Sequence, residues 1–306
     1  MSVTFTVPDK ITTSFVVATD SDPGELPSAV RHRLTGPFAK AAGERLGTPR
    51  LEITGFRAAG SPWNLDSVVG ADLEEAGRAR EAGRHIGVTA TLEVADLPFG
   101  VQVARSVTRA IAAAVSGIPV DLDTGRVLRA RPDPRDAEAT GFVLADDWFC
   151  ARAPLSPTRG QCTADEEEIN GCACVELTTR GLRRFGIPEL RIADVACAHD
   201  LAALNVLRTT AQRLLPLGTR PGEHTTGPVL SLAGSDFSAY WGSGEPMWDD
   251  GTVPVHLSQL EPLLLGVGPP ADFPDTMNDW LWDDLPPILY ELLSCDPDPA
   301  HLSFTP

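Results

Sequence analysis

Residues 45–53 read RLGTPRLEI and residues 184–192 read RFGIPELRI, so arginine, glycine, proline, leucine and isoleucine fall at the same five offsets. A glycine can end a helix in the left-handed conformation, and a proline two residues later cannot continue one. The alternating apolar and polar residues that follow are typical of a half-buried strand. Both stretches therefore predict one connection, the end of a helix followed by a strand. The repetition is either a diverged internal duplication or a convergent use of this connection.

Strand and helix patterns alternate on both sides of the first copy. Runs rich in β-branched residues indicate strands, and apolar residues at helical spacing indicate helices. The clearest helix pattern is followed by Gly117 as its expected stop. The expected strands are 11–19, 50–56, 85–94 and 118–122, and the expected helices are 27–46, 71–83 and 98–116. This order favours an α+β fold with α/β-like alternation.

Residues 132–140 contain two prolines and charges of both signs, which is typical of a linker. We therefore predict two similar-sized modules of mixed sheet and helix, residues 1–131 and residues 141–306. In the second module we expect strands at 141–152, 172–179, 189–195 and 228–232, a helix at 199–215 and a loop at 217–227. From residue 234 the pattern is irregular and rich in Trp and Asp, and a last helix pattern at 276–294 is interrupted at Pro286 and Pro287.

The composition of the 306-residue chain disfavours several classes of partner. Asp and Glu number 42 against 25 Lys and Arg, which gives a formal net charge of −17. Nucleic-acid phosphates and anionic membrane surfaces repel such a polyanion. Residues 1–10 do not resemble a secretory signal, and no run of about 18 apolar residues is present to span a bilayer. We therefore expect a soluble, cytoplasmic protein, and the scarcity of lysine suggests a GC-rich bacterial genome.

The second copy lies inside a longer motif, Thr-x-Gly-x-x-x-Phe-Gly-x-Pro-Glu-Leu, at residues 179–190. This segment resembles one found in uncharacterised bacterial domain families of unknown function, where it also lies between two strands. The resemblance covers residues 172–216. It implies a small α+β module and implies no reaction.

All six cysteines lie at or after residue 150 of the 306-residue chain. Four of them would converge if the strands near Cys150 and Cys172 paired as a hairpin, and four thiolates in a tetrahedron are a structural zinc site. The spacing contains no Cys-x-x-Cys, so the alternatives are buried core thiols or one reactive thiol. The four candidate zinc ligands are Cys150, Cys162, Cys172 and Cys174. Zinc is the one cofactor that the sequence suggests.

Two polar groupings could support chemistry. His199 and Asp200 begin a helix pattern, where a carboxylate meets the positive end of the helix dipole, and they are either a base with its orienting acid or simply a helix start. Arg180, Arg183 and Arg184 form a basic cluster that either binds a phosphate or carboxylate or pairs with Glu189 and Asp194. Phosphate-loop, dinucleotide-binding and nucleophile-elbow motifs are absent from the sequence.

Aromatic residues interleaved with aspartates mark the last 70 residues. Such a segment either forms a surface that recognises a partner or wraps against the sheets. The tryptophans expected at a partner surface are Trp241, Trp248, Trp280 and Trp282.

These observations leave three functions open. The leading hypothesis is a non-catalytic binding or regulatory accessory protein with a protein or small-molecule partner. The competing hypothesis is a pathway-specific enzyme with its active site at the junction of the two modules. Its candidate catalytic residues are Arg180, His199, Cys172 and Asp236. The third hypothesis is a structural zinc module.

Overall fold

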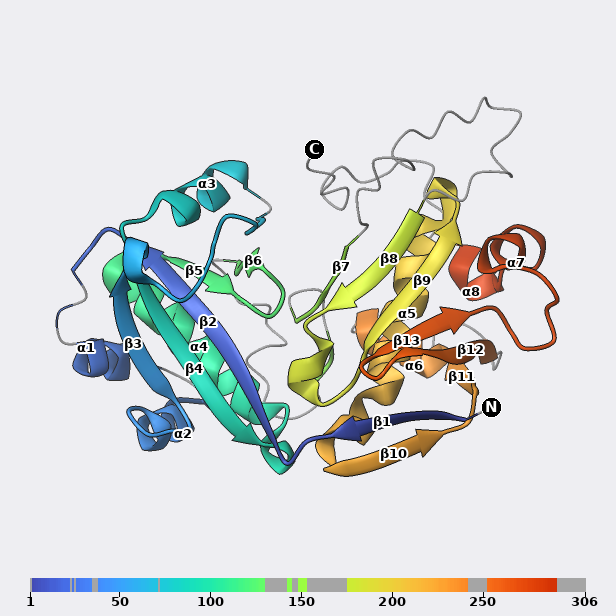
Figure 1. Cartoon of the computed structure of the whole chain (residues 1–306), viewed down its shortest axis with the longest axis horizontal. Helices are drawn as coiled ribbons and strands as arrows, with labels where there is room; N and C mark the ends of the chain where they lie inside the picture. The colour runs from blue at the N-terminus through green and yellow to red at the C-terminus, as the bar shows by residue number, and fades with distance from the viewer. Residues whose placement is uncertain are drawn as a thin grey trace. The chain divides into compact units, whose positions relative to one another are not determined.

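The computed structural model describes residues 2–22, 24, 26–34, 38–70, 72–129, 142–144, 148–152, 175–241 and 252–290. They form two compact units, one from Pro8 to Phe142 and one that joins Val3–Val7 to the residues from Val143 on. Each unit combines helices with a sheet, which confirms the predicted α+β class (Figure 1). The first strand belongs to the second unit and not, as we expected, to a module of residues 1–131. The expected linker, 132–140, lies outside the described residues.

The Pro8–Phe142 unit is built on a five-stranded antiparallel sheet with the strand order β3-β4-β2-β5-β6. Its strands are β2 (Lys10–Thr19), β3 (Glu52–Arg57), β4 (Arg84–Glu93), β5 (Ile118–Asp121) and β6 (Arg126–Val127). Its helices are α1 (Leu26–Arg33), α2 (Phe38–Arg45), α3 (Leu73–Glu81) and α4 (Phe99–Val115). The helix expected at 27–46 is thus two helices, and β3 is an exposed edge strand and not half-buried.

The central strand β2 carries the core of this unit. Residues 15–18 are each at most 1% exposed. Helix α4 packs against β2, β4 and β5, and α1 and α2 pack against α4. Val16 and Ala18 join Leu65 and Ala79 in a separate apolar cluster that includes α3. Because neighbouring strand residues point to opposite faces, burial of all four residues means that both faces of β2 are covered.

Helix α4 ends in a way that the sequence did not predict. Ser116, not Gly117, takes the left-handed conformation, with φ of 51°. Gly117 is needed for space, because a Cβ there would lie 2.6 Å from Cγ1 of Val17. The glycine therefore permits close approach of the helix end to β2.

The second unit contains a six-stranded sheet with the order β11-β12-β13-β9-β8-β7. Strands β13 and β9 are parallel, and the other neighbours are antiparallel. The strands are β7 (Cys150–Arg152), β8 (Val175–Arg180), β9 (Glu189–Val195), β11 (Val229–Ala233), β12 (Thr252–Glu261) and β13 (Leu264–Gly268). Helix α5 (Asp200–Leu214) packs against β8, β9 and β11, α6 (Gly234–Trp241) packs against α5, and α7 (Met277–Asp283) packs against β9. Helix α8 (Pro287–Tyr290) follows the break expected at Pro286 and Pro287.

Two expectations for this unit were wrong. Part of the loop expected at 217–227 is strand β10 (Gly222–Thr226), which pairs with β1 (Val3–Val7) in a separate two-stranded sheet. It has no apolar alternation, and its partner is distant in sequence, so no local pattern reveals it. The segment expected to be irregular contains β12 and β13. Alternate residues of β12 are buried as in any half-buried strand, but Pro254 in its middle obscured the pattern.

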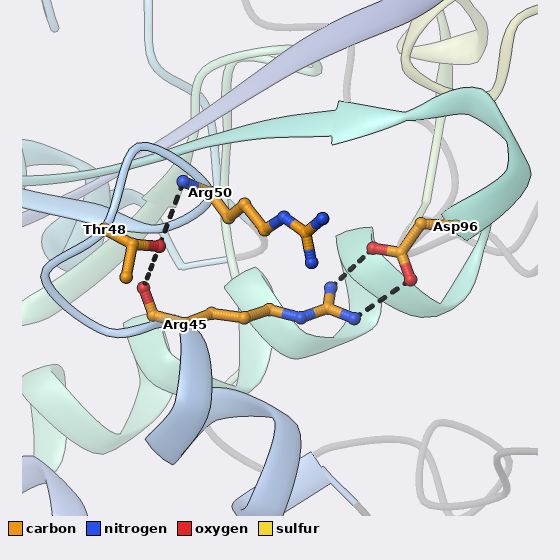
Figure 2. Close-up of polar contacts among 4 residues, drawn as sticks. All are labelled: Arg45, Thr48, Arg50 and Asp96. Carbon is orange, nitrogen blue, oxygen red and sulfur yellow. Dashed lines mark hydrogen bonds and ion pairs between the residues drawn. The ribbon is translucent and has the colours of Figure 1, made fainter.

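The first copy of the repeated segment forms the expected connection. Helix α2 ends at Arg45, Gly47 has φ of 79°, and β3 follows. Figure 2 shows the Arg45 guanidinium facing the Asp96 carboxylate, with Nη1–Oδ2 at 2.5 Å and Nη2–Oδ1 at 3.0 Å. The guanidinium also lies 5.6 Å from the centre of the Phe99 ring. The Thr48 hydroxyl donates to the Arg45 carbonyl at 2.7 Å and closes the turn.

The second copy forms the same connection with a tighter contact. The 3₁₀ helix η5 (Leu182–Phe185) replaces the α-helix, Gly186 has φ of 75°, and β9 follows. A Cβ on Gly186 would overlap the carbonyl oxygen of Gly218, and a Cβ on Gly218 would overlap the carbonyl oxygen of Phe185. Gly218 belongs to the 3₁₀ helix η7 (Leu215–Thr219), which directly follows α5. The backbone at Gly186 therefore packs directly against the backbone at Gly218, and neither position has room for a side chain.

Glu189 explains much of the longer motif. Its buried carboxylate accepts hydrogen bonds from the N–H groups of Gly181, at 2.9 Å, and Leu182, at 3.1 Å. It also accepts from the Thr179 hydroxyl at 2.8 Å, and the Thr179 oxygen accepts from the Leu190 N–H at 2.7 Å. The carboxylate thus satisfies the free N–H groups at the start of η5. The motif that carried the family resemblance is, in this structure, a hydrogen-bonded corner.

The two copies occupy non-equivalent positions. Strand β3 is an edge strand paired with β4, whereas β9 lies inside its sheet between β13 and β8. The strand orders of the two sheets also differ. What the copies share is a local connection.

The two glycines offer a matched test, because both have a positive φ and only one is crowded. The Cβ added by Gly47→Ala meets no atom within 4 Å. The only cost is the left-handed backbone, so the free energy of unfolding should fall by about 1 kcal/mol. Gly186→Ala adds a backbone overlap, so we expect a loss of about 3 kcal/mol or more in the free energy of unfolding. Urea unfolding of both variants measures the difference. Equal losses would show that Gly218 can move away at little cost.

The ion pair in Figure 2 offers a second test. The side chains of Arg45 and Asp96 are 14% and 29% exposed, against 62% and 53% for the pair of Lys10 and Glu93. Because the first pair is bidentate and partly buried, Asp96→Asn should lower the free energy of unfolding by about 1 kcal/mol. The control Glu93→Gln should change it by less than about 0.5 kcal/mol. A larger effect at Glu93 would contradict this assignment.

Candidate functional site

The carboxyl ends of two adjacent parallel strands, β9 and β13, define the candidate site. Strand β9 leads through the 3₁₀ helix η6 (Cys197–His199) into α5, and β13 leads toward α7. Ligands of sheets with parallel strands bind beyond the carboxyl ends of those strands. The segments that follow the two strands meet here, because the Ala196 N–H donates to Oδ1 of Asn278 at 2.8 Å.

His199 and Trp282 form the centre of the site. Their ring centroids are 4.3 Å apart, with the rings tilted by 58°. His199 is 3% exposed. Nδ1 of His199 and Nε1 of Trp282 are buried and find no hydrogen-bond partner among the described residues. Because most buried polar atoms are hydrogen-bonded and an unpaired one costs about 1–3 kcal/mol, two neighbouring rings with unmet hydrogen bonds are unusual.

Burial sets the protonation of both titratable groups at the start of α5. It lowers the pKa of His199 below the ordinary 6.5, which favours the neutral imidazole. It raises the pKa of Asp200 above the ordinary 3.8, and the hydrogen bond from the Leu201 N–H opposes this only in part. His199 is the N-cap residue of α5, and its side chain makes no capping hydrogen bond. The His199 ring therefore takes no part in capping α5.

Arg180 and Asp236, two other expected catalytic residues, lie on separate elements. Arg180 is the last residue of β8, and Cys172 lies outside the described residues. Asp236, in the first turn of α6, accepts from the Ala233 N–H at 2.8 Å and pairs with Arg213 at 3.8 Å. Of the four expected catalytic residues, His199 is the one that belongs to this site.

The arginine cluster is not one surface. Arg184 is buried, donates to the Trp148 carbonyl, and has its guanidinium 5.6 Å from the Trp148 ring and 5.4 Å from the Phe185 ring. Arg183 is exposed. Glu189, one expected partner of the cluster, binds backbone N–H groups instead. A buried stacking arginine supports packing of η5 and is not open to an anion from solvent.

The zinc hypothesis falls largely on residues that the structure does not describe. Cys150 is buried on β7, and Cys162, Cys172 and Cys174 lie outside the described residues. Within the described ranges, no group of three or more His, Cys, Asp or Glu is placed to hold a metal ion. The zinc site stays a prediction.

The four tryptophans expected at a partner surface have different environments. Trp280 is 1% exposed and belongs to the core, so it is not available to a partner. Trp282 contacts His199. The side chain of Trp241 and the whole of Trp248 lie outside the described part.

Sequence reasoning missed Asn278, which joins α7 to the end of β9. A signal was present in the neighbouring residues. The Thr276 hydroxyl accepts from the Asp279 N–H, and the Asp279 carboxylate accepts from the Thr276 N–H, which is a capping box. This box starts α7 one residue before Asn278.

The chain matches no protein-family model, no curated protein and no solved structure. Among the described helices, none is long and apolar enough to cross a membrane.

The lowered pKa of His199 predicts a pH dependence of stability. Below pH 6.5 the unfolded chain binds a proton at this residue more readily than the folded chain does. The free energy of unfolding should therefore fall as the pH drops below about 6.5, while above this value His199 adds no pH dependence. Burial lowers the pKa of His85 in the same direction, so His199→Phe should remove part of the fall and His85→Phe a further part. Urea unfolding between about pH 5.5 and 7.5 measures this. An unchanged slope in His199→Phe would contradict it.

Proposed function

We propose that this is a cytoplasmic binding or regulatory protein whose second unit binds a small molecule, without catalysis, at the ring nitrogens of His199 and Trp282. The supporting observation is the pair of buried ring nitrogens without partners. Burying these nitrogens without hydrogen bonds destabilises the folded chain. A bound molecule that completes the hydrogen bonds would remove this destabilisation. The net charge of −17 favours a protein or small-molecule partner over nucleic acid or membrane.

The chemistry of the two rings restricts the ligand. An indole N–H only donates, so the ligand must offer an acceptor. Nδ1 of a neutral imidazole either accepts or donates, depending on the tautomer. A hydroxyl oxygen meets both demands, and a carbonyl oxygen meets them when Nδ1 carries the proton. The ligand class is therefore a small molecule with a hydroxyl or carbonyl group, bound beside the Trp282 ring.

Ligand-observed NMR with a library of small hydroxyl and carbonyl compounds tests this proposal. Compounds that bind the wild-type chain should bind at least about tenfold more weakly to Trp282→Phe, which keeps an aromatic ring and loses the N–H. The same loss is expected for His199→Phe. The control His224→Phe changes a histidine on β10, in the separate two-stranded sheet, and should leave binding unaltered.

Two results would contradict the proposal. One is a set of compounds whose binding is equal in all four proteins. The other is a crystal structure of the protein, screened compounds present, in which a water molecule alone bridges Nδ1 of His199 and Nε1 of Trp282.

A further inference from the structure

A second pair of chemically able side chains lies in the Pro8–Phe142 unit, independent of the His199 site. Oγ of Ser61 and Nδ1 of His85 are 2.7 Å apart. Ser61 directly follows the short 3₁₀ helix η1 (Ala58–Gly60) after β3, and His85 is the second residue of β4. The distance is that of a nucleophile and its base in enzymes that form covalent intermediates.

The local backbone holds both side chains in place. Ser61 donates its N–H to the Ala58 carbonyl at 3.1 Å, and Ala58 donates its own to the Gly83 carbonyl at 2.9 Å. His85 lies opposite Phe56 in the antiparallel pair of β3 and β4 and is 5% exposed. The geometry is therefore set by the sheet and does not depend on a flexible loop alone.

The hydrogen bonds around Ser61 leave its hydroxyl able to donate to Nδ1 of His85. The backbone N–H of Trp63 donates to Oγ of Ser61 at 3.2 Å and occupies one lone pair of this oxygen. Burial lowers the pKa of His85, so its imidazole is neutral near pH 7 and Nδ1 can accept a proton. Oγ keeps a second lone pair for attack on an electrophile.

Two apolar rings lie on the face of the sheet that carries His85, since Phe56 is opposite His85 and the Trp63 ring covers Gly87 two residues further on. The Trp63 and Phe56 rings meet edge to face with centroids 5.4 Å apart, and Phe56 is 38% exposed. The Trp63 ring lies so close over Gly87 of β4 that any Cβ there would overlap it. Ser61 itself is only partly buried. A small acyl or aryl group could therefore pack against these rings while its reactive carbon meets Oγ.

We propose that Ser61 is a nucleophile, with His85 as its general base, that cleaves small apolar esters. Oγ bonds to the carbonyl carbon while its proton passes to Nδ1 of His85. The carbon–oxygen bond of the ester then breaks, and the alcohol leaves with that proton. Water releases the acid from Ser61 by the same base. Nε2 of His85 is buried and has no hydrogen-bond partner within the described part of the chain, so no described carboxylate stabilises the charged ring, and turnover should be slower than in a complete triad.

A fluorophosphonate probe on the full chain tests this proposal. Attack by Oγ displaces fluoride and leaves a stable phosphonyl ester, which mass spectrometry of the peptides should locate at Ser61 in the wild-type protein. His85→Gln should slow this labelling by about 100-fold, and Ser61→Ala should abolish it. The control Ser14→Ala changes a partly buried serine on β2 that bonds Thr89, and it should label as the wild type does.

Mapping the label on the wild-type chain requires no variant to fold. Absence of label at Ser61, under conditions that fully label a known serine hydrolase, would overturn the proposal. So would equal labelling rates in the wild type and a folded His85→Gln, since the pair would then only pin the loop to β4. Neither result bears on ligand binding at His199.

Discussion

The contact between Gly186 and Gly218 is the constraint on which the second unit most depends. Gly186 precedes β9 and Gly218 follows α5, so their contact brings the start of the strand to the end of the helix. Glu189 reinforces the same corner through backbone N–H groups. Because the start of β9 is held against the end of α5, the connection between the two elements lies at their opposite end. His199 lies in that connection. The glycine contact therefore positions the candidate site without touching it.

The two ends of this strand–helix pair differ in how well their polar groups are satisfied. At the clamped end, the buried Glu189 carboxylate has hydroxyl and N–H partners. At the other end, Nδ1 of His199 and Nε1 of Trp282 have none. Proteins tend to tolerate buried polar atoms without hydrogen bonds at functional positions, where a bound ligand supplies the missing partners. This contrast within one short stretch of chain is why we place ligand binding at His199 and a structural role at the motif of residues 179–190.

The Pro8–Phe142 unit contains none of the candidate residues that the sequence indicated, yet it carries the second chemical candidate. Ser61 and His85 are 24 positions apart and show no nucleophile-elbow pattern. Pairing of β3 with β4 brings them together, and the Trp63 N–H orients the hydroxyl. An enzyme hypothesis for this protein thus rests on a site inside one unit and needs no junction between units. The proposed binding at His199 and the proposed reactivity at Ser61 can therefore be tested separately.

The sequence by itself determined the α+β class, strands such as β2 and β9, helices α4 and α5, and the glycine connection at residues 47 and 186, because each depends on local periodicity or on backbone freedom. It also indicated His199 as a candidate. The tertiary structure alone decided the pairing of β1 with β10, the burial of Trp280, the contact of Trp282 with His199, and the Ser61–His85 pair. These features join residues distant along the chain, and no local pattern records which side chain will meet which. Sequence therefore supplied the elements, and long-range packing supplied both sites.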